Sequence, residues 1–456
     1  MAIFAKVMVA NRGAVAARVL RALGKLGVPS LAVYSDADRG APWLAMASET
    51  AHIGASAPRE SYLNQALLLE TARQAKCDAV HPGYGFLSEI AGFAQAVEDA
   101  GMRFVGPAPK WIEEMGHKTR AREFATRHGW PVGLGTGVLA PEPGSILAAA
   151  EAIGYPILVK PAAGGGGIGM LAARSPAELL AAVERAASMA ERGFGSREVY
   201  LERLVEKPRH VEIQLLGDRH GRVAHLYERD CSVQRRHQKI IEEARAPRVD
   251  RAAIEALLER VAGTLADLGY DNLGTAEMLL GEDGEYRFLE MNTRLQVEHG
   301  VTEEITGVDL VAGQLRSSAG ARLEDILPGP VMPAGHAIQA RVYAEDPRRF
   351  LPSPGTLREF CPPAATGVRV ETGYAPGREV TPHYDPLLAK VIVRDDTRAG
   401  AIDRLIGALG EFRIEGVKHN IPALVAILGS QEFREGRVHT GLAMQVVSRG
   451  FATAAG

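Results

Sequence analysis

The sequence predicts a multidomain protein of mixed α/β and α+β class, with a parallel α/β domain first and mixed domains after it. At 456 residues the chain is too long for one simple core, since domains average roughly 150 residues. A β-α-β pattern near the N-terminus indicates parallel strands. Two later stretches, one with four consecutive glycines and one with an Asp-Gly dipeptide, are typical of hairpins.

Composition and charge exclude several classes of function. The apolar content of 46% supports several filled cores, and the formal charge of −3 provides no global field that would attract nucleic acid or an anionic membrane. Cys77, Cys231 and Cys361 are far apart and form no CxxC pair, so inert thiols in a reducing compartment are expected. The apolar run at the N-terminus is too short for a signal peptide or a membrane span. We therefore expect a cytoplasmic protein without nucleic-acid or membrane partners.

The first predicted element is a β-α-β unit from Lys6 to Asp36. The run VMVA predicts a strand, AVAARVLRALGKLG an amphipathic helix, and SLAVYS a second strand. The turn between the first strand and the helix is NRG rather than G-x-G-x-x-G. A nicotinamide site is therefore disfavoured, although Asp36 stands where a ribose-binding acid could.

A strand followed by a turn rich in glycine and proline comes next, in CDAVHPGYGFLSE. Open α/β sheets present ligand-binding groups at such places. Taken alone, His81 and Glu89 are better explained as loop polarity and helix capping. RFVGPAP predicts another strand and turn, and the Gly and Pro density of HGWPVGLGTGVLAPEPGS marks the start of a new domain.

The stretch PILVKPAAGGGGIGMLAARSPAEL predicts a hairpin with glycines at its tip. A strand ends at Lys160, glycines occupy positions 164–167, a second strand begins near Met170, and a capping box at 175–178 opens a helix. A Walker loop differs, because its lysine follows the glycines and a helix comes next. Two interpretations stay open: a lid whose backbone N–H groups close over phosphates, and a plain mobile loop.

A further hairpin is predicted around the Asp-Gly dipeptide at 283–284, between TAEMLLGE and EYRFLEMN. A two-residue turn centred there pairs Leu280 with Arg287 and Glu277 with Glu290. The alternative is that a bulge breaks the register, so that the two glutamates never meet.

Two opposed carboxylates suggest a metal site. Glu277 and Glu290 repel each other unless a cation lies between them. Mg²⁺ is usually held by one or two carboxylates together with phosphate oxygens. We therefore predict a metal site at Glu277 and Glu290, with Asn292 adding an oxygen ligand.

The stretch LEMNTRLQVEHGVTE continues the second strand of this hairpin. If it stays extended, every second side chain projects from one side. Those side chains are Glu290, Asn292, Arg294, Gln296 and Glu298. An arginine fork suits a small oxyanion such as carboxylate, bicarbonate or phosphate, glutamine adds a hydrogen bond, and glutamate can remove a proton. The row predicts metal, anion and base in that order; a solvated surface strand is the alternative.

Several motifs, in order along the chain, carry a resemblance to a known family. They are HPGYGFLSE, KPAAGGGGIGM, EKPRHVEIQ, ERDCSVQRRHQKIIEEA, EMNTRLQVEHGVTE, GHAIQARVYAEDP and FLPSPG. From about Val7 to about Gly441 the sequence resembles the biotin carboxylase component of biotin-dependent, acyl-CoA-type carboxylases, which are ATP-grasp enzymes. The resemblance implies a Rossmann-like N-terminal domain at 1–115, a glycine-loop lid at 116–202, an ATP-grasp catalytic core at 203–335, a C-terminal domain at 336–447 and a flexible tail at 448–456.

The resemblance also implies a two-stage reaction and a set of site residues. ATP and bicarbonate give carboxyphosphate, whose CO₂ is transferred to N1′ of biotin. Positions expected to bind ATP or its Mg²⁺ (or Mn²⁺) are Lys118, Lys160, Gly164, Gly165, Gly166, Gly167, Met170, Glu202, Val205, His210, Gln234, His237, Glu277 and Glu290. Positions expected at the bicarbonate are Lys239, Arg294, Gln296, Val297 and Glu298. Glu298 matches the base, Lys239 a cation near bicarbonate and the transferring phosphate, and Arg341 the residue that stabilises the enolate of biotin.

Some positions depart from the family pattern. They are Ile90 for Asn, His117 for Asp, Arg245 and Gly300 for Pro, and Pro161, Ala162, Ala163 and Ile168 in the glycine loop. None removes a catalytic group, so the expected effects concern lid dynamics and rate.

Partners follow from the same resemblance. No Met-Lys dipeptide occurs, so the biotinyl-lysine motif is missing. Biotin is therefore expected on a separate biotin carboxyl carrier protein, with a separate carboxyltransferase subunit completing transfer to an acceptor, and a homodimer is expected by analogy. Two alternatives are an ATP-grasp ligase that joins a carboxylate to an amine, and a nucleotide-binding scaffold of low activity within a carboxylase complex.

Overall fold

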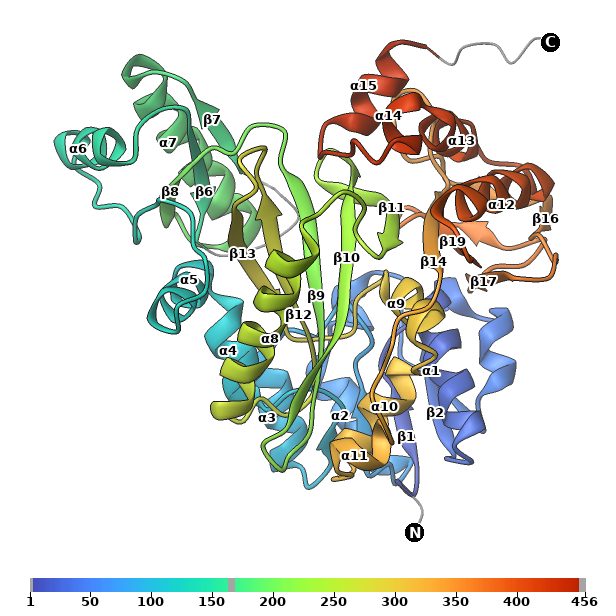
Figure 1. The fold of residues 1–456 in the computed structure, drawn as a ribbon. Coiled ribbons are helices and arrows are strands. Elements are labelled where there is room, and N and C mark those ends of the chain that lie inside the picture. Colours follow the sequence, from blue (N-terminus) through green and yellow to red (C-terminus); the bar gives the residue numbers. More distant parts are fainter. Residues whose placement is uncertain (1–2, 163–168, 451–456) are drawn as a thin grey trace.

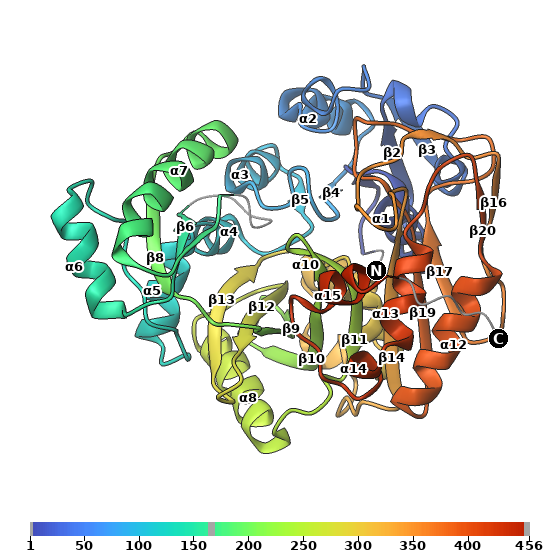
Figure 2. The same cartoon turned by 90° about the horizontal axis from the view of Figure 1, so that it is seen from above.

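The computed structural model describes residues 3–162 and 169–450. In Figure 1 the N-terminal part lies at the bottom, a separate lobe of residues 118–203 at the upper left and the C-terminal part at the upper right, with a large sheet between them. Seen from above in Figure 2, the lobe and the C-terminal helices flank that sheet on opposite sides. Among the described residues, no helix combines the length and the apolar character that crossing a membrane requires.

The N-terminal part contains a five-stranded parallel sheet in the order β3-β2-β1-β4-β5. Its strands are β1 (Val7–Val9), β2 (Ser30–Tyr34), β3 (Glu49–His52), β4 (Ala79–His81) and β5 (Arg103–Phe104). Its helices are α1 (Gly13–Lys25), α2 (Gln65–Gln74), α3 (Ala91–Asp99) and α4 (Pro109–Gly116), with short 3-10 turns at Asp36–Asp38, Pro42–Met46 and Pro58–Glu60. Val7 and Val9 pack into the core with α1 and with α10 (Leu310–Ser318), whereas Met8 packs into the core with α2 and α3. The predicted β-α-β unit is confirmed, and burial on both faces explains why VMV is apolar throughout.

The lobe is an antiparallel three-stranded sheet, β7-β6-β8, covered by helices. Its elements are α5 (Lys118–Arg127), α6 (Pro143–Ile153), β6 (Ile157–Pro161), β7 (Leu171–Ala173), α7 (Pro176–Phe194) and β8 (Val199–Arg203). The predicted capping box is only partly formed, because the Ser175 hydroxyl makes no cap hydrogen bond and Glu178 accepts one from the Arg174 amide instead (2.8 Å). The predicted tip glycines at 164–167, with Ala163 and Ile168, lie outside the described residues.

The central element is an eight-stranded antiparallel sheet in the order β13-β12-β9-β10-β11-β14-β19-β17. Its strands are β9 (Arg209–Gly217), β10 (Val223–Arg235), β11 (Gln238–Ala244), β12 (Leu273–Leu280), β13 (Tyr286–Asn292), β14 (His336–Tyr343), β17 (Val368–Thr372) and β19 (Leu387–Asp395). Helices α8 (Arg251–Asp267), α9 (His299–Thr306), α10 (Leu310–Ser318) and α11 (Leu323–Ile326) belong to this part. The sheet runs without a break across the predicted boundary at 335/336, because β11 pairs with β14.

The C-terminal part packs helices against β14 and β19 in one apolar core. Its helices are α12 (Arg398–Glu411), α13 (Ile421–Gly429), α14 (Gln431–Arg434) and α15 (Leu442–Ser448). Its short strands are β15 (Gly355–Thr356), β16 (Glu359–Cys361), β18 (Glu379–Val380) and β20 (Arg413–Glu415), which pair as β15-β18 and β16-β20. The three cysteines are free, as predicted.

One departure from the family pattern weakens a helix start. Ile90 is the N-cap residue of α3, provides no side-chain cap hydrogen bond and is 41% exposed. Asparagine is a favoured N-cap, because its side-chain oxygen accepts from the unpaired amides of the first turn. We therefore expect Ile90→Asn to raise the free energy of unfolding by about 1 kcal/mol, measured as a higher urea midpoint at unchanged slope. Ile90→Ala is the control, and an equal gain from it would contradict the capping explanation.

Candidate active site

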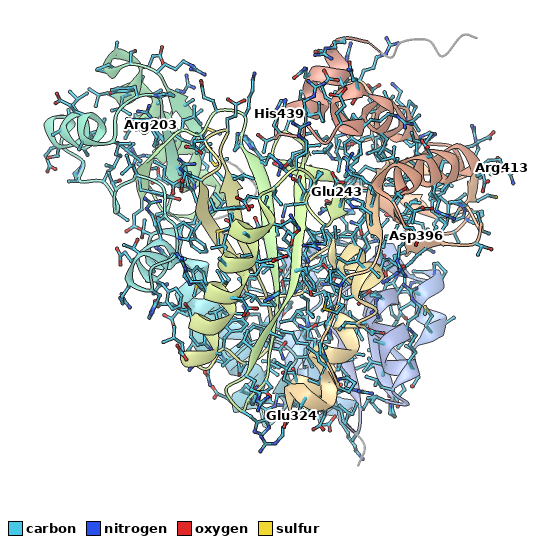
Figure 3. All side chains as sticks on the ribbon, in the orientation of Figure 1. Arg203, Glu243, Glu324, Asp396, Arg413 and His439 are labelled. Atoms are coloured by element: carbon cyan, nitrogen blue, oxygen red, sulfur yellow. The ribbon has the colours of Figure 1, made fainter. Side chains whose placement is uncertain are left out.

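One cleft gathers the predicted site residues. It has a volume of about 730 Å³ and is lined by residues of the lobe, of the strands β9 to β13 and of the C-terminal part. Every predicted site residue that the structure describes lines it: Lys118, Lys160, Met170, Glu202, Val205, His210, Gln234, His237, Lys239, Glu277, Glu290, Asn292, Arg294, Gln296, Val297, Glu298 and Arg341. Figure 3 labels Arg203, a lining residue, on the side of the lobe, and His439, next to the lining residue Thr440, on the C-terminal side.

Two lysines enter the cleft from the lobe. Lys160 on β6 is 1% exposed, and its Nζ lies 2.8 Å from Oε2 of Glu202 on the adjacent strand β8. Burial would raise the pKa of Glu202, but Lys160, Arg122 and Lys118 lower it below its usual value. Lys118 begins α5, and its Nζ lies 3.6 Å from Oε2 of Glu290. Both lysines therefore enter the cleft with a carboxylate as partner.

The hairpin of β12 and β13 brings the two predicted metal carboxylates together, although its turn and its register differ from the prediction. Glu277 is opposite Glu290, as predicted. Leu280, however, pairs with Tyr286 rather than Arg287, because the turn spans 281–285 and is longer than two residues. A register shift between Glu277 and Met278 then restores the expected pairing. The two-residue turn was wrong, while the meeting of the acids was right.

Glu277 already has several donors around it. Its Oε1 accepts from Nζ of Lys239 (3.0 Å), Nδ2 of Asn292 (2.7 Å) and Nε2 of Gln296 (3.1 Å), and its Oε2 lies 2.7 Å from Nε2 of His210. Burial alone would raise the pKa of Glu277, but Lys239 and His210 lower it far below its usual value. These donors offset the negative charge of Glu277 in the structure as it stands.

The carboxylates nevertheless suit a hard cation. Glu277 and Glu290 are cross-strand partners that both line the cleft, and carboxylate oxygens are the ligands that Mg²⁺ prefers. Asn292 is oriented differently from the prediction, since its amide nitrogen faces Glu277 and its oxygen accepts from Arg294 (2.8 Å). The residues therefore fit a metal through the two glutamates, and Asn292 would have to turn its amide to add an oxygen.

The predicted row of five side chains on one extended strand is wrong beyond Asn292. Strand β13 ends there, and residues 293–298 form a loop that leads into α9. The loop still turns its polar groups toward the cleft, because Arg294 donates to Asn292 and to Oε1 of Gln296 (3.1 Å), and Gln296 donates to Glu277. Hydrogen bonds between the side chains, rather than the alternation of a strand, therefore bring Arg294 and Gln296 together with Glu277 and Asn292 in the cleft.

Glu298 lies at the centre of a buried charge cluster. Its side chain is 0% exposed, with Oε1 2.9 Å from Nζ of Lys239 and Oε2 2.9 Å from a terminal nitrogen of Arg341. Burial would raise the pKa of Glu298, but Lys239, Arg341 and Arg229 lower it well below its usual value. Burial would lower the pKa of Lys239, but the three carboxylates around it raise that pKa well above its usual value. Glu298 is therefore a carboxylate held by two cations.

Three further glutamates belong to the site and were missed. Glu89 accepts from Nε of Arg294 (2.7 Å), Glu212 accepts from Lys239 and from Arg229 (2.9 Å), and Glu242 accepts from Nε of Arg341. The prediction of a helix cap at Glu89 is wrong, because Ile90 is the N-cap residue of α3. Glu89 instead pairs with Arg294, so it is more than a polar loop residue. Glu212 lies two residues after His210 on β9, so strand alternation could have indicated it.

The structure accounts for one of the departures from the family pattern. Gly300 lies in the first turn of α9, and a Cβ there would overlap Cδ1 of Ile392 on β19. Glycine thus lets α9, which follows directly on Glu298, lie close to the sheet. Nothing in the described contacts explains the exchange at Arg245, whose guanidinium pairs with Glu228 (3.7 Å) and Glu255 (3.4 Å).

Comparison with known proteins gives matches along almost the whole chain. Residues 3–112 match "Biotin carboxylase, N-terminal domain", residues 114–326 match "Carbamoyl-phosphate synthase L chain, ATP binding domain", and residues 339–445 match "Biotin carboxylase C-terminal domain". Biotin carboxylase 2 of Bacillus subtilis is 45% identical over 442 residues, which cover 97% of this chain and 99% of that protein. The biotin carboxylase of Halalkalibacterium halodurans is 46% identical over 437 residues, which cover 96% of each chain.

Solved structures agree with these matches. The biotin carboxylase domain dimer of the Hydrogenobacter thermophilus 2-oxoglutarate carboxylase, in complex with MgADP, ADP and bicarbonate, has a TM-score of 0.94 at 41% identity and 99% coverage of both chains. The Campylobacter jejuni biotin carboxylase in its β-γ-ATP complex also has a TM-score of 0.94, at 36% identity, covering 97% of this chain and 99% of that one. The fold and the cleft define a multidomain ATP-grasp enzyme, and the predicted fold class is confirmed. The chain belongs to the biotin carboxylase family.

Proposed function

We propose that this chain catalyses the ATP- and bicarbonate-dependent carboxylation of biotin at N1′, on a carrier that is a separate protein. The observation that carries the proposal is the cluster in which Glu298 is held by Lys239 and Arg341 beside the loop that contains Arg294 and Gln296. A carboxylate base next to fixed cations is what a reaction needs when a weak acid must lose a proton in a buried site.

In the first stage Glu298 removes the remaining proton of bicarbonate. Arg294 and Gln296 hold the anion, and Lys239 offsets the negative charge that develops during attack on the terminal phosphorus of ATP. The guanidinium of Arg294 donates to the carboxylate of Glu89 (2.7 Å) and to the amide oxygen of Asn292 (2.8 Å), and these two hydrogen bonds fix its orientation. Carboxyphosphate and ADP are the products of this stage.

The nucleotide occupies the part of the cleft near the lobe. Lys118 and Lys160 exchange their present carboxylate partners for phosphate oxygens, and His210 and Gln234, whose ring nitrogen and amide nitrogen are 3.0 Å apart, line the same wall. Glu277 and Glu290 would hold Mg²⁺ or Mn²⁺, which when bound neutralises charge on the phosphates. Positioning of this kind supplies most of the catalysis in phosphoryl transfer.

In the second stage Arg341 stabilises the enolate of biotin. Carboxyphosphate splits into CO₂ and phosphate, and the released phosphate takes the N1′ proton of biotin. The ureido oxygen of the resulting enolate carries negative charge, which a buried guanidinium stabilises while N1′ attacks CO₂. Arg341 is 8% exposed and is oriented by Glu242 and Glu298. Biotin is brought on a biotin carboxyl carrier protein, a carboxyltransferase subunit completes the transfer, and the enzyme works as a homodimer.

A turnover assay on the purified full chain tests the proposal. ADP release should depend on bicarbonate and should rise when free biotin or a biotinylated carrier is added, because both stages then run. Turnover that requires an amine in place of bicarbonate would instead identify a carboxylate–amine ligase. ATP binding without turnover, even with carrier present, would identify a nucleotide-binding scaffold, and either result would overturn the proposed function.

A further inference from the structure

A fully buried lysine behind the site has no part in the reaction described so far. Lys390 on β19 is 0% exposed and lies directly opposite Arg341 on β14 and opposite Glu371 on β17. Residues opposite one another in adjacent strands project from the same face of a sheet. The side chains of Glu371, Lys390 and Arg341 therefore form a row across β17, β19 and β14 that ends at the proposed biotin-binding arginine.

Lys390 makes two contacts that fix its position. Its Nζ donates to the backbone oxygen of Val297 (2.9 Å) and lies 2.5 Å from Oε2 of Glu371. Glu371 is held in turn by Arg369 on its other oxygen, with Nε of Arg18 from α1 3.6 Å from that oxygen. A buried ammonium is tolerated when its charge is paired, and Glu371 provides that pairing.

The loop at 293–298 needs such an anchor, because it has no strand or helix to hold its backbone. The oxygen of Leu295 accepts from Arg294 (3.3 Å), and that of Gln296 from Nδ1 of His299 (2.7 Å). Both donors belong to the loop itself or to the helix that follows it. Lys390 is the side chain among the described residues that ties a carbonyl of this loop to the central sheet. The carbonyl belongs to Val297, between Gln296 and Glu298.

We propose that Lys390, fixed by Glu371, is a positioning residue that holds the Gln296–Val297–Glu298 backbone in place, so that the anion pocket and the base keep their geometry. The inference deepens the proposed function and rests on it only in taking bicarbonate as the anion. Lys390 touches no substrate and acts through Val297. Removing its amino group should therefore loosen the anion pocket while leaving the nucleotide part of the cleft, near the lobe, unchanged.

The first test compares two ligands. Lys390→Met keeps the unbranched stem of the side chain and removes only its terminal amino group, and Glu371 keeps Arg369 as a partner. We expect the KM for bicarbonate to rise about tenfold, the effect of one lost hydrogen bond to a buried carbonyl, with the Kd for ADP unchanged. Lys390→Arg, which retains a donor, should restore most of the loss. The exposed Lys418→Met is the matched control, since Lys418 is 68% exposed and pairs with Asp346.

The second test does not depend on turnover. Hydrogen exchange of the backbone amides at 294–298 should be faster in Lys390→Met than in the wild type, and no faster in Lys390→Arg. If Lys390→Met does not fold, Lys390→Gln, one atom shorter than lysine, replaces it, and a smaller change of the same sign is expected. Unchanged exchange, an unchanged KM for bicarbonate, or a parallel loss of ADP affinity would overturn the inference. A wild type without bicarbonate-dependent turnover would overturn the proposed function, and the exchange data would still decide the role of Lys390.

Discussion

Replacing Glu298 with glutamine should lower bicarbonate-dependent ATP hydrolysis by about 10²–10⁴-fold, the usual contribution of a positioned general base, and leave ADP binding intact. Glutamine has nearly the same shape but cannot take a proton. Lys239 keeps Glu212 and Glu277 as partners, and Arg341 keeps Glu242, so the substitution orphans neither cation. The loss should therefore report chemistry rather than collapse of the cluster.

Two measurements and one control make this result decisive. Steady-state ADP release with and without bicarbonate gives the loss of activity, and titration with ADP gives nucleotide affinity. Glu282→Gln changes an exposed glutamate in the hairpin turn and should leave both quantities at the wild-type value. Bicarbonate-dependent hydrolysis that persists in Glu298→Gln would remove Glu298 as the base.

The sequence predicts best where local patterns and tertiary packing agree. VMVA, AVAARVLRALGKLG and SLAVYS predict a buried strand, an amphipathic helix and a second strand by composition and period alone, and the structure forms β1, α1 and β2 there. The sequence also predicts the pairing of Glu277 with Glu290 correctly, but only because two deviations from the predicted hairpin cancel each other. A longer turn moved the register by one residue, and a bulge moved it back, and neither event has a local sequence signal strong enough to compete with Asp-Gly.

Local sequence patterns do not predict contacts between segments that are far apart in the chain. Strand β13 ends at Asn292, and the loop that follows it is hydrogen-bonded to β19 through Lys390, which is 93 residues away from Val297. Glu89 reaches Arg294 across 205 positions of the chain. Glu212 and Glu242 lie in the motifs that carry the family resemblance, yet their contacts form only when β9, β10, β11 and β14 lie side by side. Contacts between different strands cannot be predicted from the sequence of one strand.

Replacing Arg341 with alanine should reduce biotin carboxylation by about 10²–10³-fold, as for the loss of one donor to a developing oxyanion, and reduce bicarbonate-dependent ATP hydrolysis much less. The guanidinium is proposed to contact the ureido oxygen of biotin only in the second stage, whereas Lys239 and Arg294 serve the first. Carboxybiotin formation and ADP release, followed in parallel, separate the two stages. Arg394→Ala, an exposed arginine on β19, is the matched control, and an equal loss of both activities in Arg341→Ala would contradict the enolate role.

The same variant has a signature in its pH profile, because Arg341 also contacts the base. Burial raises the pKa of Glu298, whereas Lys239 and Arg341 lower it, so removal of Arg341 leaves burial less opposed and the pKa rises. Glu298 must be ionised to accept a proton, and a higher pKa means that this form is lost at a higher pH. The acid side of the hydrolysis profile should therefore move toward neutral pH in Arg341→Ala and stay in place in Arg394→Ala. A profile that does not move would show that Arg341 does not contribute to holding Glu298 ionised, whatever its effect on biotin.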